Sequence, residues 1–146
     1  GWGRAKVIAN SVGIDPNAGH LDHNSYEKDD ETNWLNWDEK ELNQDIVNYY
    51  RGLVAIRNQY AELRNVTIGY RQFIDGSGEL SYGVAMGNKT KILVLLNADK
   101  KAAANFSLPS GSWTILADAN QANAGGHGTI EKVAVVPELS GLILAQ

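Results

Sequence analysis

Hydrophobic residues in the middle of the chain recur at helical spacing. Asp38 and Glu41 form a capping-box pattern, in which an acid at the helix start precedes a glutamate by three positions. Apolar side chains then follow at steps of mostly three and four, at Leu42, Ile46, Tyr49, Tyr50, Leu53, Ile56, Tyr60 and Leu63. This pattern predicts one amphipathic helix of about six turns, starting near Glu41. Gly52 falls inside it, at a cost of roughly 1 kcal/mol relative to alanine, which close packing would explain.

After residue 65 the pattern changes to short apolar runs separated by turn residues. Candidate strands cover residues 66–70, 72–74, 80–86, 91–97, 103–108, 112–117, 129–136 and 139–145. Many short strands with glycine-rich breaks predict a mainly β protein, an antiparallel β-sandwich. Residues 92–96 are continuously apolar and predict a central strand buried on both faces. Residues 123–128 are read as a long hairpin loop.

Tryptophans occur both ahead of the helix and within a predicted strand. Trp34 and Trp37 could serve as stacking platforms for sugar rings, but packing under the helix start is the favoured interpretation. Trp113 shares one strand face with Ile115 and Ala117, which predicts a core position. Residues 1–37 show no sustained periodicity.

Composition limits the classes of protein that need be considered. With 146 residues, 43% of them hydrophobic, the chain fits one globular domain, or one domain with an appended element. A net charge of -4 with scattered basic residues argues against nucleic acid as a partner. The chain has no cysteine, and no apolar run approaches the roughly 20 residues that span a bilayer, so no membrane partner is expected.

The first residue and the single methionine bear on the origin of the chain. Because the chain starts at Gly1 and its single methionine is Met86, we expect it to be processed or excised from a longer protein. The sequence leaves the compartment open between secreted, periplasmic and cytoplasmic.

Three motifs resemble a known family of enzymes. They are Asn24-Ser25-Tyr26, then Asp30-Glu31-x-Asn33-x-Leu35-x-Trp37, and Tyr50-Arg51-x-Leu53-x-x-Ile56-Arg57. Together they resemble the place in the pullulanase and isoamylase branch of the α-amylase superfamily of glycoside hydrolases where the catalytic barrel ends and a C-terminal sandwich begins.

This resemblance implies an architecture and a function. Residues 1–64 would be the last loop and helix of the barrel, and residues 65–146 a C-terminal Greek-key β-sandwich of the α-amylase type. The parent enzyme would hydrolyse α-glucans such as starch, glycogen or pullulan, with the linkage, α-1,6 or α-1,4, left open. The rest of the barrel would be an intramolecular partner of this piece. Two alternatives are a free-standing carbohydrate-binding module and an adhesion or interaction sandwich without a sugar ligand.

The densest group of polar side chains lies ahead of the helix, at Asp22, His23, Asn24, Tyr26, Asp29, Asp30 and Glu31. Carboxylates and amides could hydrogen-bond sugar hydroxyls while a tyrosine stacks on the ring; a solvated acidic loop is the other interpretation. The resemblance implies that Asp22, Asn24 and Tyr26 form part of the wall of the substrate cleft in the parent.

No catalytic residue is expected in this chain. Glycoside hydrolysis by a retaining enzyme needs two rigidly held carboxylates about 5 to 5.5 Å apart, and this loop offers no strand to hold them. The family's three catalytic carboxylates lie on earlier barrel strands, and Asp22-His23-Asn24 reverses the order of the family's Asn-His-Asp motif. His20, His23 and His127 are too dispersed for zinc and are interpreted as surface residues. No metal site and no cofactor is expected.

Overall fold

The computed structural model describes residues 16–21, 26, 33, 36–65, 71–88 and 91–146. The chain forms two compact units, Gly1–Val47 and Asn48–Gln146. The helices described are α2 (Glu39–Leu42), α3 (Gln44–Gln59) and α4 (Glu62–Asn65). None of the described helices is both long and apolar enough to cross a bilayer.

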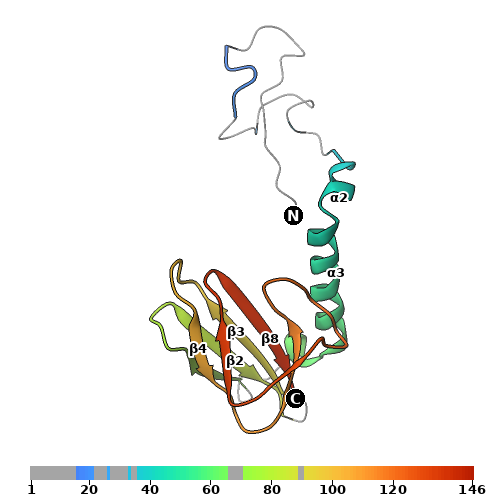
Figure 1. Cartoon of the computed structure of the whole chain (residues 1–146). Helices are drawn as coiled ribbons and strands as arrows, with labels where there is room; N and C mark the ends of the chain where they lie inside the picture. Colours follow the sequence, from blue (N-terminus) through green and yellow to red (C-terminus); the bar gives the residue numbers. More distant parts are fainter. Residues whose placement is uncertain (1–15, 22–25, 27–32, 34–35, 66–70, 89–90) are drawn as a thin grey trace. The chain divides into compact units, whose positions relative to one another are not determined.

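The rest of the second unit is β-structure with antiparallel pairing throughout (Figure 1). The strands are β1 (Arg71–Asp75), β2 (Ser81–Met86), β3 (Ile92–Asn97), β4 (Ala104–Ser107), β5 (Trp113–Ala117), β6 (Thr129–Ile130), β7 (Val133–Val136) and β8 (Ser140–Ala145). A six-stranded sheet has the order β1-β2-β3-β8-β5-β6, and β4 pairs with β7 in a two-stranded sheet. The predicted mainly β, antiparallel fold is confirmed, whereas the Greek-key connection stays a prediction.

The main core lies between these two sheets. It combines residues of the large sheet with residues of the small one: Leu93, Leu95, Trp113, Leu142 and Leu144 with Ala104, Phe106, Ala134 and Val136. Trp113 is fully buried, as its strand pattern predicted, and its indole N–H donates to the carbonyl of Pro109 at 3.0 Å. Alternation along each strand places these side chains on the inner faces, which makes the pair of sheets a sandwich.

Asn97, at the end of β3, links the large sheet to the small one. Its side-chain amide is 3.1 Å from the carbonyl oxygen of Val136 and 2.9 Å from that of Ala102, and its Oδ1 accepts the backbone N–H of Asp99. Asn97 is only 3% exposed, so these partners offset the cost of burying a polar side chain.

A second core lies on the outer face of the large sheet. Ile56 of α3 is fully buried with Ile92, Leu116, Ala117 and Ala145, and Leu53, Tyr60 and Leu63 pack around them. The sandwich therefore covers the part of the predicted stripe from Leu53 to Leu63. Leu42 and Tyr50, which the same spacing included, are 84% and 53% exposed.

Gly52 explains how closely α3 approaches the sandwich. A Cβ at this position would overlap the backbone carbonyl of Ala122, with the carbonyl carbon only 2.6 Å away. The contact accounts for a glycine in the middle of a helix, and close packing at Gly52 is confirmed.

Two predictions about local structure are wrong for the helix. Instead of one helix of six turns, α2 and α3 are separated at Asn43, whose backbone N–H and side-chain amide both donate to the carbonyl of Glu39. The predicted capping box does not form either. Asp38 has helical backbone angles and makes no side-chain cap, and its own N–H is bound by Asn36 Oδ1 at 3.1 Å.

The remaining predictions, about the tryptophans ahead of the helix and about the strands, have different outcomes. Trp37 is 65% exposed, so the interpretation that it packs under the helix start is wrong, and Trp34 lies outside the described residues, as does the candidate strand 66–70. The predicted strand 129–136 is two strands in different sheets, separated at Lys132. The predicted central strand is confirmed as β3, with Ile92, Leu93 and Leu95 fully buried and Leu96 38% exposed.

Candidate functional site: the junction of helix α3 with the β5–β6 loop

Of the three residues predicted to line a substrate cleft, the structure describes Tyr26. Asp22 and Asn24 lie outside the described residues, while Tyr26 is described and is 87% exposed. Their role in a cleft wall therefore stays a prediction.

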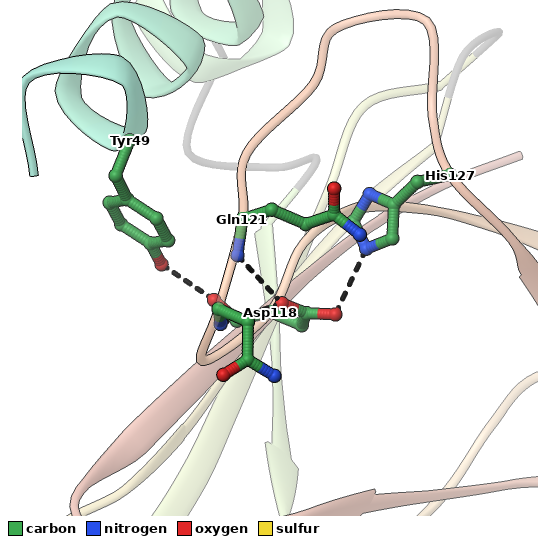
Figure 2. A network of polar contacts seen from close by, with 5 residues as sticks. Tyr49, Asp118, Gln121 and His127 are labelled. Carbon is green, nitrogen blue, oxygen red and sulfur yellow. Dashed lines mark hydrogen bonds and ion pairs between the residues drawn. The ribbon is translucent and has the colours of Figure 1, made fainter. Parts of the chain in front are cut away.

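The described residues instead bring together a polar network where α3 meets the sandwich. We call Tyr49, Asp118, Gln121 and His127 the junction network (Figure 2). The Tyr49 hydroxyl, on α3, donates to the backbone carbonyl of Asp118 at 2.7 Å. Asp118 follows β5 directly, and its Oδ1 accepts the backbone N–H groups of Asn120 at 2.8 Å and Gln121 at 2.9 Å. The carboxylate thus closes the turn that begins the β5–β6 loop.

His127 completes the network from the other end of the same loop. Its Nε2 lies 3.0 Å from Asp118 Oδ2, and its side chain is 13% exposed. The interpretation of His127 as a surface residue is therefore wrong, because the hairpin folds back and buries the ring against Asp118. Nδ1 of His127 is buried and has no hydrogen-bond partner in the described structure.

Burial and charge shift two acid groups in the network. Burial alone would raise the pKa of Asp118, but the Asn120 and Gln121 N–H groups and the His127 ring stabilise the carboxylate, so its pKa lies below the ordinary value. The pKa of Tyr49 is raised, first by burial and then by the nearby Asp118 carboxylate. Both groups are held in the forms that make the observed hydrogen bonds, Asp118 ionised and Tyr49 neutral.

Sequence reasoning missed this network because its members are far apart in sequence. An aspartate at a strand end followed by Asn120 and Gln121 is a recognisable turn signal. The partners Tyr49 and His127 could not be inferred, since the Tyr49 hydroxyl reaches a backbone carbonyl 69 positions away.

A pocket of about 330 Å³ opens elsewhere, beside β1, β2 and β3. It is lined by Arg71, Gln72, Ala85, Met86, Gly87, Lys91, Leu93, Pro109 and Trp113. This lining contains two cations, Arg71 and Lys91, and no carboxylate among the described residues. Neither the pocket nor the junction network, which has the single carboxylate of Asp118, presents the carboxylate pair that glycoside hydrolysis requires.

Within the described residues, no group of three or more His, Cys, Asp or Glu side chains is placed to hold a metal ion.

Comparison with known proteins supports the resemblance to pullulanases. A pullulanase from Bacillus acidopullulyticus matches 86% of this chain with a TM-score of 0.76 and 26% sequence identity. The structure of a pullulanase from Anoxybacillus sp. LM18-11, complexed with maltotetraose, matches 84% of this chain with a TM-score of 0.69 and 21% identity.

A curated relative agrees with these structures. A cyclomaltodextrinase from Geobacillus thermopakistaniensis (strain MAS1) is 28% identical over 82 residues, which are 54% of this chain. The matches span only 16% and 18% of the two pullulanase chains and 14% of the cyclomaltodextrinase. No family model matches the sequence. The chain is thus similar to a small part of α-glucan-active enzymes of the pullulanase and α-amylase type.

Proposed function

We propose that this chain is the C-terminal portion of a pullulanase-like glycoside hydrolase that acts on α-glucans. In this proposal residues 1–64 end the catalytic barrel and residues 65–146 form the C-terminal sandwich domain. The portion itself is structural: it carries the last helix of the barrel on a rigid β-sandwich and contributes Asp22, Asn24 and Tyr26 to the wall of the substrate cleft.

The observation that carries the proposal is the pair of apolar stripes on α3. The stripe containing Leu53 and Ile56 packs on the sandwich, and Gly52 makes a close contact with it at Ala122. A different stripe presents Tyr50, 53% exposed, and Val54, 57% exposed, four positions apart on the helix. A helix with apolar surface in more than one direction fits a position between two layers of protein, which is where the last barrel helix would lie.

The junction network and Gly52 explain how such a helix would be attached to the sandwich. Tyr49 binds the Asp118 carbonyl, and the Gln59 side chain donates to the carbonyl of Ala124 at 3.1 Å. Because α3 is fixed to the sandwich at Tyr49, Gly52, Ile56 and Gln59, we infer that the sandwich holds the barrel's final helix in position.

The first experiment compares this chain with the product of a longer reading frame. We expect the gene to continue upstream of the codon for Gly1 and to encode a barrel with an aspartate nucleophile and a glutamate acid. The longer protein should release reducing sugar from pullulan, starch or glycogen, while this chain alone should release none. Hydrolysis by this chain alone, or an upstream region without a barrel, would contradict the proposal.

A free-standing carbohydrate-binding module is the second candidate, and one observation favours it. Phe73 and Tyr82, on adjacent strands, are 76% and 51% exposed, as expected of aromatic platforms for sugars. Calorimetry of this chain with maltotetraose separates the candidates. A module would give saturable binding that is lost in Phe73→Ala, whereas a structural portion of a larger enzyme would give no heat of binding at this surface.

A further inference from the structure

The pocket beside β1, β2 and β3 collects positive charge in a chain that is negative overall. Its lining includes Arg71 and Lys91 and no carboxylate among the described residues, although the chain has a net charge of -4. In the part of the chain that the structure describes, neither cation forms an ion pair. A cavity lined by one sign of charge focuses the electric field and attracts a counter-ion. The charge of the pocket therefore points to an anionic ligand.

Strand register explains why the sandwich leaves a pocket at this place. Gln72 of β1 is the direct partner of Ala85 in β2, and Ala85 is the direct partner of Leu93 in β3. Leu93 is fully buried in the main core, so this row of residues lies on the inner face of the large sheet. The small sheet has two strands against six, and at a spacing of about 4.8 Å between strands it cannot cover the whole inner face. The uncovered row forms the floor of the pocket.

The two cations lie at the rim of this floor. Lys91 directly precedes β3, and its backbone N–H and carbonyl bind Gln146 at 3.0 and 2.9 Å, which continues the ladder between β3 and β8. Alternation along the strand then places the Lys91 side chain on the same face as Leu93. Arg71 begins β1 at an edge of the large sheet and is exposed, like Lys91. Because both side chains carry their charge on a flexible stem, they can converge on one anionic group.

The other walls of the pocket indicate the body of the ligand. Ala85, Met86 and Pro109 supply apolar surface that is at least partly exposed. Trp113 is fully buried, so it offers no free ring face on which a planar base could stack. Aliphatic walls fit the CH groups of a saturated ring, and the Gln72 amide can both donate to and accept from hydroxyl groups. Ligand pockets measure roughly 300 to 1,000 Å³, so a volume of about 330 Å³ holds one ring rather than a chain of rings.

We infer that this pocket binds a sugar phosphate, with the phosphate on Arg71 and Lys91 and the hydroxyls of one hexose ring on Gln72. A phosphate monoester carries a charge of about -1.5 to -2 at pH 7, which matches two cations better than a carboxylate does. Arginine and lysine both donate charge-assisted hydrogen bonds to phosphate oxygens. The choice of glucose as the hexose rests on the proposed function, because α-glucans are polymers of glucose.

Nuclear magnetic resonance titration of this chain tests the inference. Glucose 6-phosphate should shift the backbone amide signals of Gly87 and Lys91 in a saturable way, whereas glucose should not. Inorganic phosphate should shift the same signals with an affinity at least about tenfold lower, because it lacks the ring that contacts the walls. Absence of saturable shifts with glucose 6-phosphate would overturn the inference. Equal affinity for the two phosphates would also overturn it, since the pocket would then select an anion and not a sugar.

Substitution of the two cations assigns the phosphate site. Lys91→Gln and Arg71→Gln should each weaken binding of glucose 6-phosphate at least about tenfold, since each removes a charge-assisted hydrogen bond. Lys100→Gln is the matched control, because Lys100 is also exposed but lies beyond the other end of β3, at least about 20 Å from Lys91 along the strand. All three side chains are exposed, so the variants should fold. An equal loss of affinity in all three would mean non-specific attraction and would refute the site.

Gln72→Leu tests recognition of the ring. It should weaken binding of glucose 6-phosphate about fivefold, through the lost hydrogen bonds to hydroxyls, and leave the affinity for inorganic phosphate unchanged. Gln72 is exposed on an edge strand, so this variant should also fold. An equal loss for both ligands would contradict the assignment of Gln72 to the sugar.

A further ligand distinguishes the two sources of such a group. Maltotriose with a phosphate on O6 of its non-reducing glucose should bind as well as glucose 6-phosphate if the pocket takes the phosphorylated end of an α-glucan. It should be excluded if the pocket takes the free sugar phosphate. The proposed function fails separately. An upstream region without a barrel would leave binding by this chain intact, and an active longer protein that ignores every phosphate would overturn only the present inference.

Discussion

At the scale of single residues, two positions decide how α3 is attached to the sandwich. Gly52 allows the helix backbone to approach the Ala122 carbonyl, and Asp118 organises the loop that Tyr49 and His127 contact. Neither residue is apolar, so their contribution comes from shape and charge rather than from burial of hydrophobic area.

Gly52→Ala tests the contribution of shape. In an exposed helix position this change would stabilise the protein by up to about 1 kcal/mol. Here the new Cβ overlaps backbone atoms of Ala122, which cannot rotate away, so we expect a loss of about 1 to 3 kcal/mol in the free energy of unfolding. Urea denaturation measures it, with Asn58→Ala at an exposed position of α3 as the control that should be neutral or stabilising. A stabilised Gly52→Ala variant would contradict the close contact.

Asp118→Asn tests the contribution of charge. The pKa of Asp118 in the folded chain lies below its ordinary value of 3.8, so the carboxylate stabilises the fold above that value, and this stabilisation disappears as the pH falls through the folded pKa. The amide can still accept the Asn120 and Gln121 N–H groups. We therefore expect wild type to be more stable than the variant at neutral pH, with the difference shrinking below about pH 4. Thermal unfolding across pH measures the difference, and one that grows in acid would refute this account.

Sequence reasoning succeeded at the residues whose environment is set locally. The core position of Trp113 follows from alternation along a strand, that of Ile92 from a continuous apolar run, and that of Ile56 from spacing along the helix. Residues whose role depends on a distant backbone, such as Tyr49 and His127, could not be assigned, because no local pattern encodes a partner in another element.

At the scale of elements, the sequence predicted where strands occur better than where they end. Residues 129–136 were predicted as one strand, yet β6 pairs with β5 in the large sheet and β7 pairs with β4 in the small one. The break is a γ-turn: Lys132 has φ 64°, and the Val133 N–H donates to the Glu131 carbonyl at 2.7 Å. Hydrophobic periodicity does not report backbone handedness, which is why a lysine at positive φ escaped prediction.

Lys132→Gly tests the strain at this strand crossing. A side chain at positive φ costs about 1 to 2 kcal/mol, and glycine removes that cost at the price of a more flexible unfolded chain. We expect a net rise of about 0.5 to 1 kcal/mol in the free energy of unfolding, whereas Lys132→Val should lower it. Chemical denaturation of the three proteins gives the order, and a valine variant as stable as the glycine variant would argue against the turn.

At the scale of the whole molecule, both hydrophobic cores are built from the second unit. Their described members begin at Leu53 and extend to Ala145, and none of the described residues before α2 belongs to either core. The resemblance predicts a division between residues 64 and 65, whereas the two compact units divide between Val47 and Asn48. The boundaries differ because part of α3 packs on the sandwich, although the resemblance assigns this helix to a barrel.

A shortened chain tests this arrangement. A protein that starts at Asn36 should keep its near-ultraviolet circular dichroism and unfold within about 4 °C of the full chain, since no described residue before Asn36 belongs to either core. Loss of cooperative unfolding would mean that the first 35 residues support the sandwich. A chain that starts at Asn65 provides the contrast, because it lacks Ile56 and should expose the second core.

The position of β8 has a consequence for how the protein is made. This strand, the last of the described strands along the sequence, lies between β3 and β5, and in the part of the chain that the structure describes it alone links the two halves of the large sheet. The ribosome adds about 5 to 20 residues each second. Ser140–Ala145 are therefore synthesised after every other described strand. Until β8 is added, the edges of β3 and β5 are unpaired and can form hydrogen bonds with strands of other chains. The large sheet can therefore close only after β8 has been synthesised and has joined β3 to β5.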